Sequence, residues 1–530
     1  MPKRELPLIF AFFVLFAVLF AVLCITSCVS VSAEILEVCP NCGNYEYVKV
    51  EVTCDNAILS DGEGKIPLNA KNKILVAAKN ATEFYRRFGF YPDIEAQKVD
   101  RRFALSNQGE EIFLLCNGTL EDTLAYGKSG SGLASFQDRE VVYFRNNGSW
   151  DFRYVDWTDF EPIYDTVSGR IIVFPNELEI KAEKSLILVS YTLPEELNLR
   201  ELAKKGVKIE IFLDSSPVGR IPLEEVEILK DLKAEGVEVH FLDSNSYKNF
   251  HYKFAIVDGR KVIITTENWK TSNRGYMVEL ESEKIAKMLL DVINSDRKYT
   301  SPTSSHGKIS DLKGFKKSGI SGKEVEFEGE VEVFVLPDYN PIFGFISSSK
   351  EELLIEVPYM DLTWFGTDKL LDLIENACKN GSKVRILLDS KYSKERNEKL
   401  ISFLNELARK KGYDLEAKLI ALKGFESLHG KMIYSDGNCV ITSANFNEYG
   451  FKLNREVGII IKDKKACEFL RNQFYEDWKD RFEVLDFTEE LTKDFPKDFT
   501  KDLTRIPSPF TCVAAILSLL TAFLIRNLRS

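Results

Sequence analysis

The chain has 530 residues, enough for about three domains of ordinary size. Its apolar fraction of 45% is that of an ordinary globular protein, and its formal net charge at pH 7 is −11. A charge of this sign excludes a broadly basic coat for nucleic acid, but it leaves room for a local basic groove.

Residues 1–33 carry the features of a targeting segment. Lys3 and Arg4 form a short positive start, and an almost unbroken apolar run follows over residues 7–25. This run is longer than an ordinary signal core and long enough to span a bilayer, and residues 31–33 offer a small-residue cleavage site. We therefore predict a signal peptide or an N-terminal membrane anchor.

A second uncharged apolar run lies near the other end of the chain, over residues 510–525, and Arg526 and Arg529 follow it. We predict a transmembrane or sorting segment over residues 508–526, with residues 486–507 as a stalk before it. The basic residues at both ends of the chain should stay inside the cell. The body of the protein is therefore expected on the outer face of the cell membrane, or secreted.

Four Asn-x-Ser/Thr sequons agree with an outside location. They predict N-glycans at Asn80, Asn117, Asn147 and Asn380. Sequons also occur by chance, so each one is a separate prediction.

Residues 34–158 have the pattern of a β domain. Residues 46–52 alternate between polar and apolar side chains, as a half-buried strand does. Further strands are expected over residues 74–78, 111–115 and 141–144, and turn signals separate them. The pattern predicts a β-sandwich.

Parts of this domain also resemble the lamin-tail domain. The resemblance rests on residues 35–38, 44–52, 105–109 and 124–127. It implies an immunoglobulin-like β-sandwich, which in that family commonly serves as an accessory or targeting module.

Four cysteines, Cys39, Cys42, Cys54 and Cys116, concentrate in the β domain. One or two disulfides in an oxidising compartment are the preferred interpretation, and half of a zinc site at Cys39 and Cys42 is the alternative. Cys378, Cys439 and Cys467 are expected to be ordinary buried side chains.

An internal repeat follows the β domain. Residues 204–214 and 379–389 share one pattern, in which a helix ends at a glycine and an apolar strand ends at an aspartate eight residues later. The glycines are Gly206 and Gly381, and the aspartates are Asp214 and Asp389. We predict one α/β fold used twice, with a first half over residues 159–300, a linker over 301–330 and a second half over 331–485.

Each half contains the pattern His-x-Lys-x4-Asp, at residues 251–258 and 429–436. The chain has only four histidines, and two of them begin these patterns. Because side chains alternate along a strand, the His and the Lys of each pattern share one face. Two such faces brought together place two imidazoles and two ammonium groups around one anion: His251, Lys253, His429 and Lys431.

These four side chains suit a phosphodiester, and the reaction needs no metal or cofactor. One neutral imidazole attacks phosphorus, and the other, protonated, donates a proton to the leaving oxygen. The lysines offset the charge on the non-bridging oxygens. Asn268 and Asn445 can donate further hydrogen bonds.

A carboxylate behind each imidazole would fix its tautomer and its orientation. Glu279 and Glu456 are the candidates, because each follows its asparagine by eleven residues. Asp258 and Asp436 end the two motifs and are expected to brace the motif loops.

The paired motif resembles the phospholipase D superfamily, whose signature continues with a Gly-Ser-x-Asn element and a downstream acid. Here that element is Thr-Thr-Glu-Asn over residues 265–268 and Thr-Ser-Ala-Asn over residues 442–445, both without the usual glycine. The second copy also has the Asn-x-Glu ending of the family, at residues 454–456. The resemblance covers roughly residues 160–485. It implies α/β architecture, with duplicated α-β-α units that share one active site, and a metal-independent phosphodiesterase that works through a covalent phosphohistidine.

Members of that superfamily act on nucleic acids or on phospholipids, so the resemblance leaves the substrate open. An extracellular nuclease fits the lamin-tail neighbour, whereas a phospholipase D or phosphatidyl transferase fits membrane anchoring. A non-catalytic surface-binding protein with a decayed site is the alternative from another class.

Overall fold

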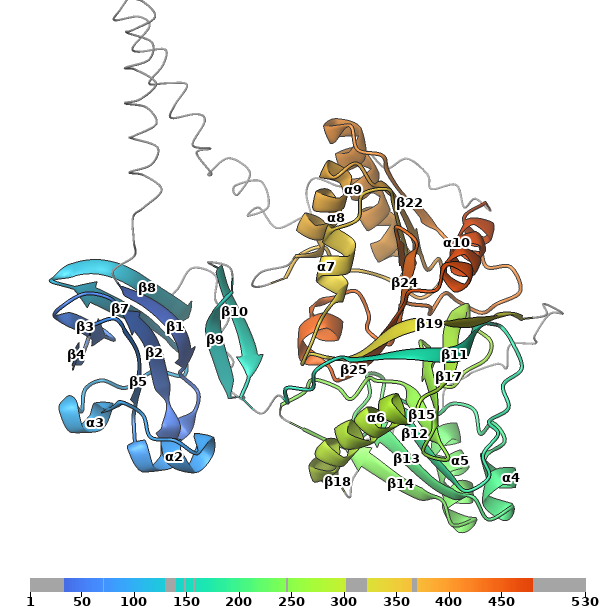
Figure 1. Cartoon of the computed structure of the whole chain (residues 1–530), viewed down its shortest axis with the longest axis horizontal. Helices are drawn as coiled ribbons and strands as arrows, with labels where there is room; N and C mark the ends of the chain where they lie inside the picture. Colours follow the sequence, from blue (N-terminus) through green and yellow to red (C-terminus); the bar gives the residue numbers. More distant parts are fainter. Residues whose placement is uncertain are drawn as a thin grey trace, which may run out of the picture.

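The computed structural model describes residues 33–69, 71–128, 140–146, 149–155, 158–244, 246–301, 322–364 and 369–479. The expected targeting segment except Ala33, the stalk, the C-terminal segment and the sequon at Asn147 lie outside the described residues. In the part of the chain that the structure describes, no helix combines the length and the apolar character needed to cross a membrane. Figure 1 shows a smaller β domain beside a larger α/β domain.

The β domain consists of two sheets around a shared core (Figure 1). One sheet has the order β10-β9-β1-β2-β5-β6, and the other has the order β4-β3-β7-β8. Apolar side chains from both sheets, such as Val48 and Leu114, belong to the same buried cluster. The strands are β1 (Ala33–Cys39), β2 (Tyr47–Val52), β3 (Ala57–Ser60), β4 (Lys65–Leu68), β5 (Lys73–Ala78), β6 (Ile94–Glu95), β7 (Gly109–Cys116), β8 (Thr119–Gly127), β9 (Val141–Asn146) and β10 (Ser149–Tyr154).

The four strands expected from alternation correspond to β2, β5, β7 and β9. Short helices η1 (Gly43–Tyr45), α2 (Ala81–Phe88) and α3 (Ala96–Val99) lie between the strands. The side-chain oxygen of Asn80, one of the predicted glycan sites, caps the start of α2. The immunoglobulin-like and lamin-tail character of this domain stays a prediction, as do the glycans.

Disulfides join the cysteines of the β domain in two pairs, Cys39 with Cys42 and Cys54 with Cys116. Both pairs match the preferred interpretation, and the bonded sulfurs are no longer zinc-binding thiolates. The expectation for Cys439 and Cys467 was wrong, because these two residues also form a disulfide. They are 28 residues apart in sequence, and only the packing of α10 against β24 brings them together. Cys378 is free and buried, as expected.

The α/β domain is built on one sheet, in which equivalent strands of the two halves follow each other in the same order from the centre outward. The order is β18-β14-β13-β12-β15-β16-β17-β11-β19-β25-β24-β23-β20-β21-β22. Strands β11 and β19 pair antiparallel at the centre, and each strand on one side has its counterpart on the other, with β18 as an extra edge strand. The expected duplication is therefore present, and a pseudo-twofold axis passes between β11 and β19.

The first half contains β11 (Ile163–Phe174), β12 (Ser185–Ser190), α4 (Leu199–Lys204), β13 (Lys208–Asp214), α5 (Leu223–Ala234), β14 (Glu238–Leu242), β15 (Phe254–Val257), β16 (Lys261–Thr265), β17 (Gly275–Glu281), α6 (Glu283–Asp296), η2 (Arg297–Tyr299) and β18 (Thr300–Ser301). The second half contains β19 (Lys323–Leu336), α7 (Ile342–Ser347), β20 (Glu352–Val357), α8 (Leu370–Lys379), β21 (Lys383–Leu388), α9 (Lys394–Lys411), β22 (Leu415–Leu419), β23 (Met432–Ser435), β24 (Asn438–Thr442), η3 (Tyr449–Leu453), β25 (Glu456–Ile461) and α10 (Lys464–Lys479).

Strand β19 begins at Lys323, inside the segment expected to be a linker over residues 301–330, so that boundary was wrong. Residues 324–333 alternate between glutamate and mostly apolar side chains, which is the pattern of a half-buried strand. The basic character of the segment before it concealed this alternation.

One buried cluster spans both halves of the α/β domain. It includes Ile285 and Leu289 of α6, and Leu470 and Phe474 of α10, together with side chains from the strands of both halves. Two further clusters cover one half each, beneath α4 and α5 and beneath α7, α8 and α9. Because the largest core is shared, the two halves form a single unit.

The β domain packs against the second half at η3. Lys452 of η3 forms a buried ion pair with Asp151 of β10, at 2.7 Å, and Leu453 belongs to the core cluster of the β domain. Helix η3 lies in the segment between Asn445 and Glu456, two of the expected site residues.

Candidate active site

The two motif histidines lie three residues before equivalent strands, β15 and β23, and each is held by the backbone of the opposite half. The amide of His251 donates to the carbonyl of Arg455 at 2.9 Å, and the amide of His429 donates to the carbonyl of Arg274 at 2.9 Å. The pseudo-twofold axis thus brings both motifs to one place, as the sequence predicted.

His251 is almost fully buried, and its Nδ1 lies 2.8 Å and 2.9 Å from the two carboxylate oxygens of Glu456. Ser443 donates to Glu456 at 2.5 Å and Asn454 donates to it at 3.0 Å, so the carboxylate is itself fixed. The ring of Tyr191 packs edge-on against the imidazole at 4.7 Å. Burial lowers the pKa of His251 to about 4, so the ring is neutral near pH 7 and Nε2 is the nitrogen that can react.

His429 has an equivalent set of partners, but its carboxylate is one that the sequence did not predict. Nδ1 of His429 lies 3.2 Å from Oε1 of Glu267. Thr266 donates to Glu267 at 3.1 Å and Asn273 donates to it at 3.0 Å. Burial, followed by the charge of Lys431, lowers the pKa of His429 from its ordinary value.

Lys253 and Lys431 are both fully buried beside the histidines. Their ammonium groups donate to the carbonyls of His251 and His429 at 2.5 Å and 2.7 Å, and Nζ of Lys431 is also 3.2 Å from both ring nitrogens of His429. Burial lowers the pKa of Lys253 to about 7 and that of Lys431 to about 8. Each lysine also lowers the pKa of the histidine of the opposite half, so the four groups share one electrostatic environment.

Asn268 and Asn445 follow β16 and β24, on the same loops as Glu267 and Ser443. Both side chains are partly exposed, yet the Oδ1 atom of each is buried and has no hydrogen-bond partner in the described part of the chain.

The expectation that Asp258 and Asp436 brace the motif loops was wrong, because they brace other segments of the chain. Asp258 accepts hydrogen bonds from the backbone amides of residues 183–185, and Asp436 accepts them from those of residues 350–352. These segments lead into β12 and β20, at the end of the motif strands away from the imidazoles.

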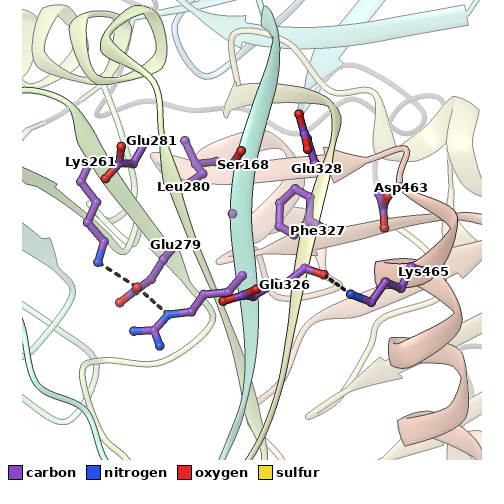
Figure 2. A pocket seen from close by; sticks show the side chains of 12 residues that line it. Ser168, Lys261, Glu279, Leu280, Glu281, Glu326, Phe327, Glu328, Asp463 and Lys465 are labelled. Atoms are coloured by element: carbon purple, nitrogen blue, oxygen red, sulfur yellow. Dashed lines mark hydrogen bonds and ion pairs between the residues drawn. The ribbon is translucent and has the colours of Figure 1, made fainter.

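Glu279 does not reach a histidine, so the structure contradicts its expected position. Its carboxylate lies 2.8 Å from Nζ of Lys261 and 2.7 Å from Nε of Arg170, in a polar pocket along β11 and β17. Figure 2 shows Glu279 pointing toward Lys261, among side chains that belong to this pocket and not to the motifs.

Unequal loop lengths explain the error. From Asn268 to the Asn-Arg pair at residues 273–274 the chain advances five residues, whereas from Asn445 to the pair at residues 454–455 it advances nine. A constant spacing of eleven therefore selects a residue four positions too far along β17, a shift of about 13 Å. Aligning the two Asn-Arg pairs would have placed Gly275 opposite Glu456 and would have directed attention to Glu267.

Asp214 and Asp389 also hold the motif loops, a role that the sequence did not indicate. A carboxylate oxygen of Asp214 accepts from the amide of Phe250 at 2.7 Å, and one of Asp389 accepts from the amide of Leu428 at 2.8 Å. Phe250 and Leu428 directly precede the two histidines. The repeat itself was visible in the sequence as two strands that end in aspartate.

Two buried arginines tie the halves together next to the site. Arg455 contacts Asp296 of α6 at 3.1 Å and Asp338 at 2.9 Å, whereas Arg274 contacts Asp477 of α10 at 2.9 Å. Asp296 and Asp477 occupy equivalent positions, 21 residues after Gly275 and Glu456. Each arginine therefore crosses from its own half to the last helix of the other.

Glu210, Glu238 and His240 form the one described group whose potential metal-ligand atoms lie within 4.8 Å of one another. It lies on β13 and β14, and Arg297 already contacts Glu210 at 2.6 Å. A guanidinium at this place competes with a cation, so we assign no metal to it.

Comparison with known proteins identifies the α/β domain. Residues 179–297 and 342–478 match the family model described as cardiolipin synthase, PLD-like domain. A cardiolipin synthase of Clostridium perfringens (strain SM101 / Type A) is 23% identical over 391 residues, which cover 65% of this chain and 75% of that protein. A probable cardiolipin synthase of Bacillus subtilis (strain 168), YwiE, is 23% identical over 319 residues, which cover 53% of this chain and 57% of that protein.

Among solved structures, the phosphatidylserine synthase of Haemophilus influenzae Rd KW20 aligns with 64% of this chain and 89% of its own, at 14% identity and a TM-score of 0.43. The two segments that match the family model contain both histidine motifs.

Proposed function

We propose that this phosphodiesterase-type enzyme, whose α/β part is a duplicated PLD-like domain, transfers the phosphatidyl group of a phospholipid through a covalent phosphohistidine. The observation that carries the proposal is that each motif histidine contacts a glutamate of the opposite half, His251 with Glu456 and His429 with Glu267. Two buried lysines lie beside these contacts. Each half lacks part of the machinery, so only the joined halves provide a nucleophile, a proton donor and two positive charges.

His251 is the proposed nucleophile, because burial keeps its ring neutral and Glu456 holds Nδ1 as the protonated nitrogen. In the first step Nε2 of His251 forms a bond to phosphorus and the bond from phosphorus to the leaving oxygen breaks. The imidazolium of His429 gives its proton to that oxygen, which departs as an alcohol. A bound phosphate anion favours the protonated form of His429 before this step.

In the second step an acceptor hydroxyl attacks phosphorus and the bond to His251 breaks. The acceptor gives its proton to the neutral ring of His429, which restores the starting state. Lys253, Lys431 and the amides of Asn268 and Asn445 offset the charge on the non-bridging oxygens throughout. Water as the acceptor would give hydrolysis, and an alcohol would give a new phosphodiester.

The relatives favour a lipid over a nucleic acid as the substrate. The relative from Clostridium perfringens is named as a cardiolipin synthase, and the one from Bacillus subtilis is named as a probable cardiolipin synthase. The description of the matching family model also names cardiolipin synthase. Of the two substrate classes that the sequence left open, phosphatidyl transfer therefore has the stronger support. The intact pair of histidines, lysines and carboxylates also argues against a site that has lost its chemistry.

The test uses the full chain reconstituted with vesicles that contain fluorescently labelled phosphatidylglycerol, with and without ethanol, and with EDTA present. We expect phosphatidic acid in water and phosphatidylethanol when ethanol is added, and neither product with His251→Ala. Plasmid DNA is incubated in parallel. Cleavage of DNA without any lipid product would replace the proposal with the nuclease reading.

A second measurement tests the covalent step. Protein mixed with a phospholipid labelled at phosphorus is quenched in acid and separated from free lipid. We expect a label bound through a phosphorus–nitrogen bond that chases into product, and that His251→Ala does not form. Inversion of configuration at phosphorus, measured with a chiral diester, would contradict two successive displacements.

A further inference from the structure

Two positions in the first half differ from their counterparts in the second half in a compensating way. Thr265 pairs with Met277, and Thr442 pairs with Gly458, so the two halves align residue by residue at this point. In that alignment Gly275 stands where the second half has Glu456. Glu267 stands where the second half has Ala444. One half thus carries Glu and Gly, and the other carries Ala and Glu.

The two carboxylates nevertheless have the same three kinds of partner. Each contacts Nδ1 of a motif histidine, the side-chain amide of the asparagine in the Asn-Arg pair, and the hydroxyl of the residue after the threonine that ends β16 or β24. That hydroxyl belongs to Thr266 for Glu267 and to Ser443 for Glu456. The carboxyl group therefore occupies an equivalent place although it comes from a different point of the backbone.

The space at Gly275 explains why the two positions change together. A Cβ atom built on Gly275 would lie 2.5 Å from Cδ and 2.7 Å from Cγ of Glu267, and closer still to Oε1. The backbone at Gly275 is not in the left-handed region, so an ordinary residue suits its conformation. The glycine is thus required by the side chain of Glu267 and not by a turn.

We propose that Glu267 is the positioning residue of His429, and that positions 267 and 275 are exchangeable as a pair, because a glutamate at either one places a carboxylate against Nδ1. The proposal rests on the proposed function for its effect on turnover. It goes beyond that function in assigning to Glu267 the positioning role that the sequence predicted for Glu279. It also states which double substitution keeps a carboxylate against Nδ1 of His429.

The carboxylate acts on His429 in two ways. By accepting a hydrogen bond from Nδ1–H it leaves Nε2 as the nitrogen that carries the mobile proton, and its negative charge favours the imidazolium that donates this proton. Removing the charge should therefore lower the pKa of His429, because Glu267 is one of the groups that raise it. A residue that only filled space would not have this effect.

The experiment compares Glu267→Ala, Glu267→Gln, Gly275→Glu and the double variant Glu267→Ala/Gly275→Glu in the full chain. Glu267→Ala and Glu267→Gln should lower kcat for phosphatidyl transfer by about 10²- to 10⁴-fold, with little change in KM. Gly275→Glu alone should be poorly folded, since its side chain meets Glu267. The double variant should recover at least about tenfold in kcat over Glu267→Ala, because the carboxylate returns to its place.

Histidine titration by NMR tests the same idea without any substrate. The chain has only four histidines, and His240 lies apart from the site and serves as an internal reference. The pKa of His429 should fall in Glu267→Gln and should return toward the wild-type value in the double variant. Glu279→Gln is the matched control, because it removes a buried carboxylate near the other end of β17, and it should leave His429 unchanged.

Two results would overturn the proposal. The first is a normal kcat together with a normal titration of His429 in Glu267→Gln. The second is a double variant that unfolds at the wild-type temperature and still recovers neither the rate nor the titration of His429. If the wild-type protein transfers no phosphatidyl group at all, the proposed function fails, and the titration still decides whether Glu267 positions His429.

Discussion

In the PLD-like domain, the first half supplies the carboxylate that contacts Nδ1 of His429 from residue 267, and the second half supplies the one that contacts Nδ1 of His251 from residue 456, on the following strand. The loops between these two positions also differ, since residues 269–272 form a short link and residues 446–453 include η3. Yet the histidines, lysines, asparagines and buried arginines correspond one to one. The comparison shows that the place of the carboxyl group relative to Nδ1 is preserved, while the backbone position that supplies it is free to change.

The two histidines should have different roles in the reaction despite their equivalent positions. The loss of activity when either one is replaced is the largest expected effect. His251→Ala and His429→Ala should each lower phosphatidyl transfer by at least about 10³-fold, and the double variant should lose little more, because the two groups act as a unit.

A diester with p-nitrophenol as its leaving group separates the two roles. Such a leaving group needs no proton in the first step, so His429→Ala should release a burst of about one equivalent of p-nitrophenol at much of the wild-type rate, and His251→Ala should not. Recovery in His251→Ala instead would reverse the assignment. Near-normal lipid turnover in either single variant would contradict a shared site.

The two arginine contacts should differ in their effect on stability. Arg455→Met leaves Asp296 and Asp338 buried without their partner, and breaking such a buried pair costs about 3–5 kcal/mol. Arg274→Met leaves one carboxylate, that of Asp477, without its ion-pair partner and should cost less. Chemical unfolding of both variants measures the difference. Equal losses would show that the second carboxylate beside Arg455 adds nothing.

The pH dependence of ligand binding should follow the two buried lysines. Burial lowers the pKa of Lys253 to about 7 and that of Lys431 to about 8, so both lysines are charged below pH 7 and lose their charges as the pH rises through these values. Affinity for a phosphonate analogue of the diester, which keeps one negative charge from pH 5 to 9, should therefore fall above pH 7, by up to about tenfold per pH unit for each lysine that loses its proton.

Titration of His251 should not contribute over most of this range, because its pKa is lowered to about 4. Calorimetric titration at successive pH values gives the profile. A constant affinity from pH 6 to 9 would show that both lysines stay charged in the unbound enzyme.

The smallest effect is expected at Glu279, the residue whose spacing matched that of Glu456. Glu279→Gln should leave kcat within about twofold and should lower the free energy of unfolding by about 1 kcal/mol or less, because Lys261 and Arg170 are partly exposed.

The sign of the pH dependence follows from the pKa of Glu279, which is lowered in the folded chain by its bonds to Arg170 and Lys261 against the opposing effect of burial. The contribution to stability is present above the unfolded pKa of about 4.3 and is lost as the pH falls below it. Unfolding at pH 7 and pH 3 gives this difference. A large fall in kcat would show that Glu279 takes part in catalysis after all.

The sequence was sufficient for those parts of the fold that depend on local patterns. The two His-x-Lys motifs, the repeat that ends at Asp214 and Asp389, and the alternating strands of the β domain are all where they were predicted. These features are visible because periodicity and spacing within a strand do not depend on distant residues.

The errors arose where position depends on a loop or on the opposite half. Glu267 reaches His429 across the pseudo-twofold axis, over 162 residues of sequence, and no local pattern reports such a contact. The disulfide between Cys439 and Cys467 likewise depends on the packing of a helix on a strand. Strand β19 was missed for a simpler reason, since its alternation was present in residues 324–333 and was read as part of a linker.

The contact between Asp151 and Lys452 has a consequence for the order in which the protein is assembled. The two residues are 301 positions apart, so a ribosome that makes about 5–20 residues per second reaches Lys452 about 15–60 s after Asp151. The β domain has time to form its own core in that interval, but its attachment must wait for the segment that ends at Glu456. Its docking onto η3 is therefore a late event in synthesis, and it can occur only after both histidine motifs have been made.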